Sequence, residues 1–265
     1  MSQILHVSFN EDYSSFALGT TTGFVVYSCN PLHERFRRDF GRGIGIVEML
    51  GTSNILALVG GGPNPYAPPS KVIIWDDAQG KAVLEYDFAR EIRAIRAHGD
   101  VISLVLDGEV FVHSIRNLDV LTTLYTVSSP HCMCSIGDVS PDVVAVATLG
   151  ARPDSIHVER VNVADGTSES QAFCAHKSPV SIIHVSPDGR YVASTSEKAY
   201  YVRVFETTSG KGNLVREFLR GNTSTGITSM CFSTDNSLLL ASSAGGTAHI
   251  FELVDHEKGM ISSKK

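Results

Sequence analysis

Hydroxyl and basic side chains gather in the last third of this 265-residue chain, in stretches that suit phosphate binding. A cation offsets phosphate charge, arginine can bind it bidentately, and serine and threonine give directed donors. Residues 176–250 carry more basic than acidic side chains, although the whole chain has a formal net charge of −6. The stretches are His176-Lys177-Ser178, Ser194-Thr195-Ser196-Glu197-Lys198, Phe218-Leu219-Arg220-Gly221, and Ser242-Ser243 with Thr247 and His249. By spacing alone, the solvated rim of a folded domain would look similar.

Other reactive residue types do not form a catalytic pattern. The run Gly60-Gly61-Gly62 is followed by Pro63, without the Gly-Lys-Ser/Thr ending and helix of a phosphate-binding loop. Residues 60–70 are therefore expected to form a stiff, exposed connection that is structural or contacts a partner. Asp76 and Asp77 follow a predicted strand and should face opposite ways, which favours a turn or a hydrogen bond between neighbouring sheets over an acid–base pair. All ten histidines stand singly.

The cysteine content predicts no metal site. Only Cys132 and Cys134 are close in sequence, and a zinc site needs a second pair or histidines at ligand spacing. We expect buried thiols in a reducing, cytosolic compartment. The remaining cysteines are Cys29, Cys174 and Cys231. A secretory signal is not expected, nor is a spanning helix, since the chain lacks an apolar stretch of about 18 residues. The negative charge argues against broad nucleic-acid binding.

The elements that position these residues are predicted to be short strands throughout. Residues 101–106 and 110–115 read as a hairpin around Gly108. A larger unit of three strands recurs about every 40 to 50 residues, the period of a β-propeller blade. The units span residues 5–29, 45–77, 91–115, 129–161, 178–207 and 225–253. Their third-strand markers are Tyr27, Trp75, Val112, Val158, Phe205 and Phe251. The pattern predicts an all-β, WD-repeat-type β-propeller forming one domain over residues 1–265.

Several stretches resemble the PROPPIN family, the autophagy-linked WD-repeat propellers that include the animal WIPI proteins. The resemblance covers essentially the whole chain and is closest to the compact branch. The matching stretches are residues 47–50, 56–62, 68–77, 175–176, 193–198, 202–205 and 242–251. The resemblance implies a seven-bladed fold that binds phosphatidylinositol 3-phosphate and 3,5-bisphosphate at two rim pockets and recruits lipid-transfer and conjugation proteins of autophagy. It implies no cofactor and no enzymatic activity.

The family motif Phe/Leu-Arg-Arg-Gly sends its two arginines into different pockets, and this chain departs from it. Leu219 replaces the first arginine, and Ala199-Tyr200 stands where the family commonly has Gly-Thr. The resemblance therefore implies one intact pocket in unit six and one weakened pocket in unit five. The unit-six set is Arg220, Gly221, Ser242, Ser243, Thr247 and His249; the unit-five set is His176, Ser178, Thr195 and Arg203.

The resemblance also exposes an absence. Residues 254–265 are short and polar where the family has the last strand of blade six, a partly hydrophobic membrane loop and blade seven. Six units account for nearly all of the chain. Either the ring closes with six blades or it leaves strand edges open, which favours aggregation or pairing with a partner strand.

These residues are compatible with three alternative functions. The first is a non-enzymatic, monomeric adaptor that binds 3-phosphorylated phosphoinositides on autophagic, endosomal or vacuolar membranes and recruits autophagy proteins. The second is a protein-interaction scaffold with weakened or lost lipid binding. The third, a propeller enzyme, has little support, because paired carboxylates are not evident. Residues 63–69 and the rims of units two and three are candidate protein-facing surfaces.

Overall fold

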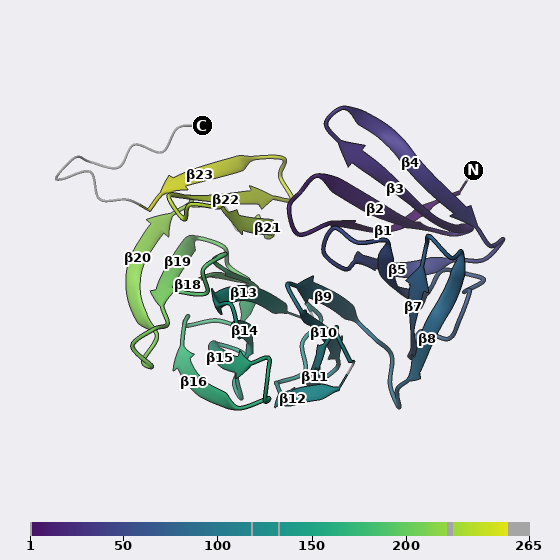
Figure 1. The fold of residues 1–265 in the computed structure, drawn as a ribbon. Helices are drawn as coiled ribbons and strands as arrows, with labels where there is room; N and C mark the ends of the chain where they lie inside the picture. The colour runs from purple at the N-terminus through teal and green to yellow at the C-terminus, as the bar shows by residue number, and fades with distance from the viewer. Residues whose placement is uncertain (1, 118, 132, 222–224, 254–265) are drawn as a thin grey trace. The chain divides into compact units, whose positions relative to one another are not determined.

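The computed structural model describes residues 2–117, 119–131, 133–221 and 225–253, and the strands are labelled in Figure 1. Cys132 and residues 254–265, which enter two of the expectations above, lie outside these ranges. The described residues form strands, turns and loops without a helix, which confirms the all-β prediction. Among them there is accordingly no helix long and apolar enough to cross a membrane.

The strands form six antiparallel sheets, the blades of a WD-repeat-type β-propeller fold. Blades one to five have four strands each, and the described part of blade six has three. The strands of blades one to three are β1(Ile4–Phe9), β2(Ser15–Thr20), β3(Gly23–Cys29), β4(Leu32–Asp39), β5(Ile44–Met49), β6(Ile55–Gly60), β7(Lys71–Asp76), β8(Lys81–Asp87), β9(Ala94–His98), β10(Val101–Leu106), β11(Glu109–Ser114) and β12(Val120–Tyr125). Those of blades four to six are β13(Cys134–Ser140), β14(Val143–Leu149), β15(Ser155–Asn162), β16(Ser168–Cys174), β17(Val180–Val185), β18(Tyr191–Ser196), β19(Tyr201–Glu206), β20(Asn213–Leu219), β21(Ile227–Phe232), β22(Leu238–Ser243) and β23(Ala248–Glu252).

Each repeat unit read from the sequence spans the first three strands of one blade. Five of the six third-strand markers are buried, and Tyr27 is half-buried. The hairpin at Gly108 forms between β10 and β11, with Gly108 at φ 81°, where glycine is favoured. The chain separates into two compact units, Met1–Asp107 with Val112–Leu118, and Gly108–Phe111 with Asp119–Lys265. The single domain over residues 1–265 stays a prediction.

The first unit has a core rich in aromatic residues. Phe24 and Trp75 meet edge to face, with their ring centroids 6.5 Å apart, and Phe40 lies 5.3 Å from Trp75. Tyr66, in the connection between β6 and β7, stacks on Phe40 at 4.4 Å. This connection is therefore anchored by packing, and its exposed residues are Gly62, Pro63, Asn64, Pro68 and Pro69.

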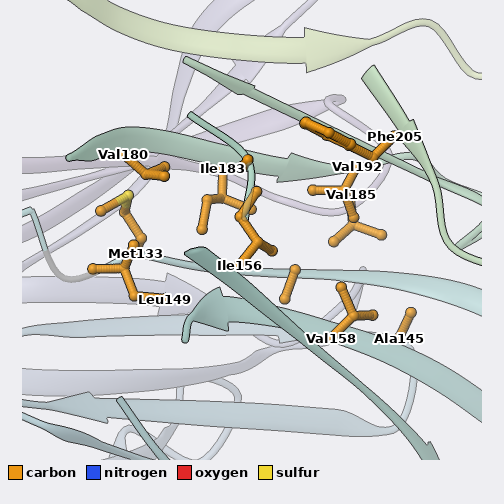
Figure 2. Packing of buried hydrophobic residues seen from close by; sticks show 12 residues of the cluster. Met133, Ala145, Leu149, Ile156, Val158, Val180, Ile183, Val185, Val192 and Phe205 are labelled. Carbon is orange, nitrogen blue, oxygen red and sulfur yellow. The ribbon is translucent and has the colours of Figure 1, made fainter. Parts of the chain in front are cut away.

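The second unit is held by aliphatic residues from facing sheets. Figure 2 shows Met133, Leu149, Ile156 and Val158 from the blade-four region opposite Ile183 and Val185 of β17. Ile156 and Val158 are completely buried. A second cluster joins the strands of blades five and six, and Phe218 of β20 stacks on Phe251 of β23 at 4.7 Å. Apolar residues on alternate strand positions thus pack neighbouring blades together.

Two turns show why the repeat is visible in the sequence. In blade five, Ser186 Oγ donates to Asp188 Oδ1 at 2.6 Å, and the Tyr191 amide donates to Ser186 Oγ at 2.9 Å. In blade six, Ser233 Oγ donates to Asp235 Oδ1 at 2.6 Å, and the Leu238 amide donates to Ser233 Oγ at 2.9 Å. Serine followed two residues later by aspartate therefore closes the same turn in both blades.

Candidate phosphate-binding sites

Neighbouring side chains of strand β20 lie on opposite faces of blade five. Phe218 is buried in the cluster shared with blade six, whereas Glu217 pairs across the sheet with Arg203 of β19. Leu219 follows Phe218 and, by alternation, belongs to the face of Glu217. It is 59% exposed and lies opposite Tyr201. The position that the resemblance assigns to the first arginine of the motif is thus occupied by an exposed leucine on the face of Glu217.

Arg220 directly follows β20, and by alternation it belongs to the face of Phe218, which packs in the cluster shared with blade six. Its amide donates to the Tyr200 carbonyl at 2.8 Å, which continues the ladder past the end of β20. Its Nε donates to the Ala199 carbonyl at 2.7 Å, and Ala199 is a buried member of the cluster between blades five and six. Ala199 has φ 53°, a conformation that favours glycine, so alanine is accommodated here at some backbone cost.

Three of the predicted unit-six residues form one polar group at the hairpin between β22 and β23. Ser243 Oγ lies 2.8 Å from Thr247 Oγ1, and Thr247 Oγ1 lies 3.4 Å from His249 Nε2. The Ser243 amide donates to the Thr247 carbonyl at 2.9 Å, which closes the hairpin. Ser243 is buried, Thr247 is exposed and His249 is half-buried. The group therefore offers two hydroxyls and an imidazole at one edge of blade six.

Ser242 does not join this group. It is adjacent to Ser243 on β22, so its side chain belongs to the opposite face of the sheet. Its hydroxyl lies 3.1 Å from Thr228 Oγ1. Gly221, also predicted for this site, follows Arg220 at φ 156°, and a Cβ added there would meet no atom within 4 Å.

The predicted unit-five residues form a more closed arrangement. His176 Nε2 lies 2.9 Å from Ser194 Oγ, and both residues are buried. Ser194 pairs across β18 and β19 with Arg203. Arg203 Nη1 donates to the Ala175 carbonyl at 2.7 Å, and Arg203 Nε donates to Glu217 Oε2 at 2.7 Å. The arginine is thus already engaged by two oxygen acceptors.

The other two unit-five residues contribute differently. Thr195 is completely buried, and its hydroxyl donates to the Tyr201 carbonyl at 3.0 Å. This bond holds β18 to β19 within blade five. Ser178 precedes β17 and is half-buried. The structure therefore groups His176 with Arg203 and separates Thr195 from them.

Burial lowers the pKa of His176 to about 4, and the nearby Arg203 adds to this effect. The imidazole is therefore neutral at pH 7. At that pH the positive charge of this group comes from Arg203, which forms an ion pair with Glu217.

The carboxylates of Asp76 and Asp77 have structural partners, as expected. Asp76 accepts hydrogen bonds from Asn54 Nδ2 and Gln79 Nε2, both at 2.5 Å, within blade two. Asp77 forms an ion pair with Arg38 of β4 at 2.8 Å, which links blade one to blade two. They do not form an acid–base pair.

The expectation of buried thiols is wrong for three of the four described cysteines. Cys134 is buried, but Cys29 and Cys231 are half-buried and Cys174 is exposed. These residues lie at strand ends or on partly exposed strand positions, where a small side chain is not forced into the core.

Three polar partners at the two sites are absent from the predicted sets, although Ser194 belongs to one of the hydroxyl-rich stretches. Glu217 holds Arg203, Ser194 contacts His176, and Thr228 contacts Ser242. Each pair joins residues at least fourteen positions apart, so the contacts follow from strand pairing. Glu217 could have been predicted as the partner of Arg203 only from the cross-strand register of β18, β19 and β20.

Comparison with known proteins identifies relatives along the whole propeller. Autophagy-related protein 18e of Arabidopsis thaliana is 32% identical over 256 residues, covering 95% of this chain and 66% of that protein. SVP1-like protein 2 of Schizosaccharomyces pombe is 30% identical over 254 residues, covering 96% of this chain and 68% of the relative. This chain thus spans about two thirds of the length of these relatives.

Solved structures share the fold. Kluyveromyces lactis Hsv2 matches with a TM-score of 0.82 at 23% identity, covering 96% of this chain and 74% of that one. A complex of KlAtg21 with the coiled-coil of AgAtg16 matches with a TM-score of 0.80 at 23% identity, covering 95% of this chain and 81% of the other. The PROPPIN family model matches residues 4–260. Because that match covers nearly the whole chain, this protein belongs to the PROPPIN family.

Proposed function

We propose that this protein is a non-enzymatic adaptor that binds 3-phosphorylated phosphoinositides through blade six and recruits autophagy proteins to membranes. The observation that carries the proposal is the group Ser243, Thr247 and His249 at the edge of blade six. By alternation, Arg220 belongs to the face of blade five whose buried cluster is shared with blade six. Family membership supports it, because the relatives include autophagy-related proteins.

The chemistry of blade six suits a phosphate monoester. Arg220 supplies a guanidinium, a group whose planar set of N–H donors suits phosphate, and its Nε donates to the Ala199 carbonyl. Ser243 and Thr247 hydrogen-bond to each other, and a bound phosphate would exchange that contact for two hydroxyl donors. His249 adds a further nitrogen beside Thr247. The ligands we propose are phosphatidylinositol 3-phosphate and the 3,5-bisphosphate.

Blade five is proposed as the weaker pocket. Leu219 brings no donor to the face where the family has an arginine, and Arg203 is engaged by Glu217 and Ala175. Each charge-assisted hydrogen bond contributes about 1.5–3 kcal/mol. Losing one guanidinium therefore weakens this pocket by about tenfold or more, and weakens two-site attachment to one membrane as well.

We propose that the protein acts as a monomer, in the cytoplasm and at the surface of autophagosome precursors, endosomes or vacuoles. A relative in this fold class has been solved with the coiled-coil of AgAtg16, which supports autophagy proteins as the class of partner. The exposed residues Pro63, Asn64, Pro68 and Pro69 are our candidate for the protein-facing surface.

A second candidate function is a protein scaffold without useful lipid binding. The exposed Leu219 and its cross-strand neighbour Tyr201 favour it, because neither brings a positive charge to the rim where the family binds phosphate. A measurement of lipid binding distinguishes the two functions, because the adaptor binds 3-phosphorylated phosphoinositides and the scaffold does not.

The test is flotation with phosphatidylcholine vesicles containing either phosphatidylinositol 3-phosphate or unphosphorylated phosphatidylinositol. The parent protein should float with the first and not with the second. Arg220→Ala should reduce flotation at least tenfold, since it removes a charge-assisted contact. Arg216→Ala, four residues earlier on β20 and with the same change in charge, is the matched control and should float like the parent. Equal flotation of Arg220→Ala and the parent would refute the blade-six assignment.

A further inference from the structure

The ion pair between Arg203 and Glu217 is the partly exposed side of the blade-five group. The Arg203 and Glu217 side chains are 23% and 39% exposed, and Nε and Oε2 are 2.7 Å apart. Arg203 and Glu217 are register partners across β19 and β20, which brings the carboxylate beside the guanidinium. The pair is therefore in contact with solvent.

Backbone and carboxylate together determine where the guanidinium points. Nη1 donates to the Ala175 carbonyl, beside His176, and Nε donates to Glu217. The His176 ring, neutral at pH 7, contacts Ser194 on the neighbouring strand. Every polar side chain of the group His176, Ser194 and Arg203 thus has a partner inside the protein.

We propose that Glu217 is a specificity-determining residue that occupies Arg203 in place of a phosphate, and so limits the protein to one strong phosphoinositide pocket. The inference rests on the proposed lipid-binding function. Carboxylate and phosphate are both anions that guanidinium binds through paired hydrogen bonds. A phosphate reaching Arg203 must displace the carboxylate or lie beside it, and like charges in close contact repel.

Glu217 differs from the other departure at this site. Leu219 withholds a donor from the pocket, whereas Glu217 engages a donor that is present. Removing the carboxylate charge should release Arg203 without adding a new group. An ion pair this exposed is worth at most about 1 kcal/mol, so releasing Arg203 should tighten binding about two- to fivefold.

The experiment titrates parent and variant proteins with phosphatidylcholine vesicles containing phosphatidylinositol 3-phosphate. Glu217→Gln keeps the side-chain shape and should tighten binding about two- to fivefold. Glu206→Gln, which makes the same charge change at the other end of β19, is the matched control and should bind like the parent. In an Arg203→Met background, Glu217→Gln should bring no gain, because its effect passes through the guanidinium. Melting temperatures check that each variant is folded.

Three results would overturn the inference. In the first, Glu217→Gln binds the vesicles with the parent's affinity. In the second, Glu217→Gln and Glu206→Gln gain the same affinity. In the third, Glu217→Gln still gains affinity in the Arg203→Met background. Arg220→Ala in the same series tests the proposed function separately. If Arg220→Ala binds as the parent while Glu217→Gln gains through Arg203, the blade-six assignment fails and the role of Glu217 stands. If Arg203→Met does not fold, the comparison of Glu217→Gln with Glu206→Gln decides the matter.

Discussion

At the scale of single residues, the protein separates functions by strand alternation. Leu219 and Arg220 are adjacent in sequence, but they belong to opposite faces of blade five. The same rule separates Ser242 from Ser243 in blade six. A polar run in the sequence therefore overstates the size of a site, because only every second residue can serve one face.

The first prediction concerns Glu48, a buried carboxyl on β5. It is 7% exposed, its Oε1 accepts a 3.4 Å bond from the Ala97 amide, and burial raises its pKa to about 7. The folded state therefore binds the proton more tightly than the unfolded state, where the pKa is near 4.5. The stabilising effect of the neutral carboxyl is complete below pH 4.5 and is lost as the pH rises through 7.

Glu48→Gln removes this titration, so the variant should gain stability relative to the parent between pH 5 and pH 8. The gain is on the order of 3 kcal/mol at most. Urea unfolding of both proteins at several pH values measures it. His6, whose pKa burial lowers to about 4, acts in the opposite direction in both proteins and cancels from the difference. A difference between variant and parent that does not change with pH would contradict this account.

At the scale of elements, the connection after β6 requires glycine for close backbone approach. A Cβ added at Gly60 would lie 1.8 Å from the Ala67 carbonyl oxygen, and that oxygen belongs to the backbone. The neighbouring loop is held by a hydrogen bond from the Gly43 amide to the Asn64 carbonyl at 2.7 Å. We therefore expect that the backbone at Ala67 cannot move far enough to accept a side chain at Gly60.

Gly60→Ala should destabilise the protein by about 2 kcal/mol or more, as is typical of substitutions that overpack a buried site. Gly226→Ala is the control, because a Cβ there would meet no atom within 4 Å and its φ is not in the region that favours glycine. Thermal unfolding compares the two variants. Similar melting temperatures for both would show that the connection can move.

Three strands of each blade are predictable from the sequence, because they carry buried β-branched and aromatic residues between turns that contain glycine, aspartate or serine. The outermost strands β4, β8, β12, β16 and β20 are not, since they are partly exposed, and β4, β8 and β20 also carry charges of both signs. The ion pair of Glu217 was missed for this reason. It lies on an outermost strand, where hydrophobic alternation is weak and does not reveal the register.

At the scale of the whole molecule, the repeats predict one cooperative domain, which the chain's single tryptophan can test. Trp75 lies in the core of the first compact unit, and Ile156 is completely buried in the core of the second. Ile156→Ala should cost about 2–5 kcal/mol. If the chain unfolds as one domain, the midpoint followed by Trp75 fluorescence should fall as far as the midpoint followed by circular dichroism.

Independent unfolding of the two compact units would leave the Trp75 midpoint of Ile156→Ala at the parent's value, and the one-domain prediction would then be wrong. Val47→Ala, a completely buried position in the first unit, is the matched control, because it lowers the fluorescence midpoint in either case.

The central claim, one strong phosphoinositide pocket in blade six, is tested most directly by calorimetric titration with inositol 1,3-bisphosphate, the soluble headgroup of phosphatidylinositol 3-phosphate. The account predicts one dominant site per chain in the parent protein, lost in Arg220→Ala and retained in Arg216→Ala. Two sites of equal affinity, or binding that survives Arg220→Ala, would contradict it.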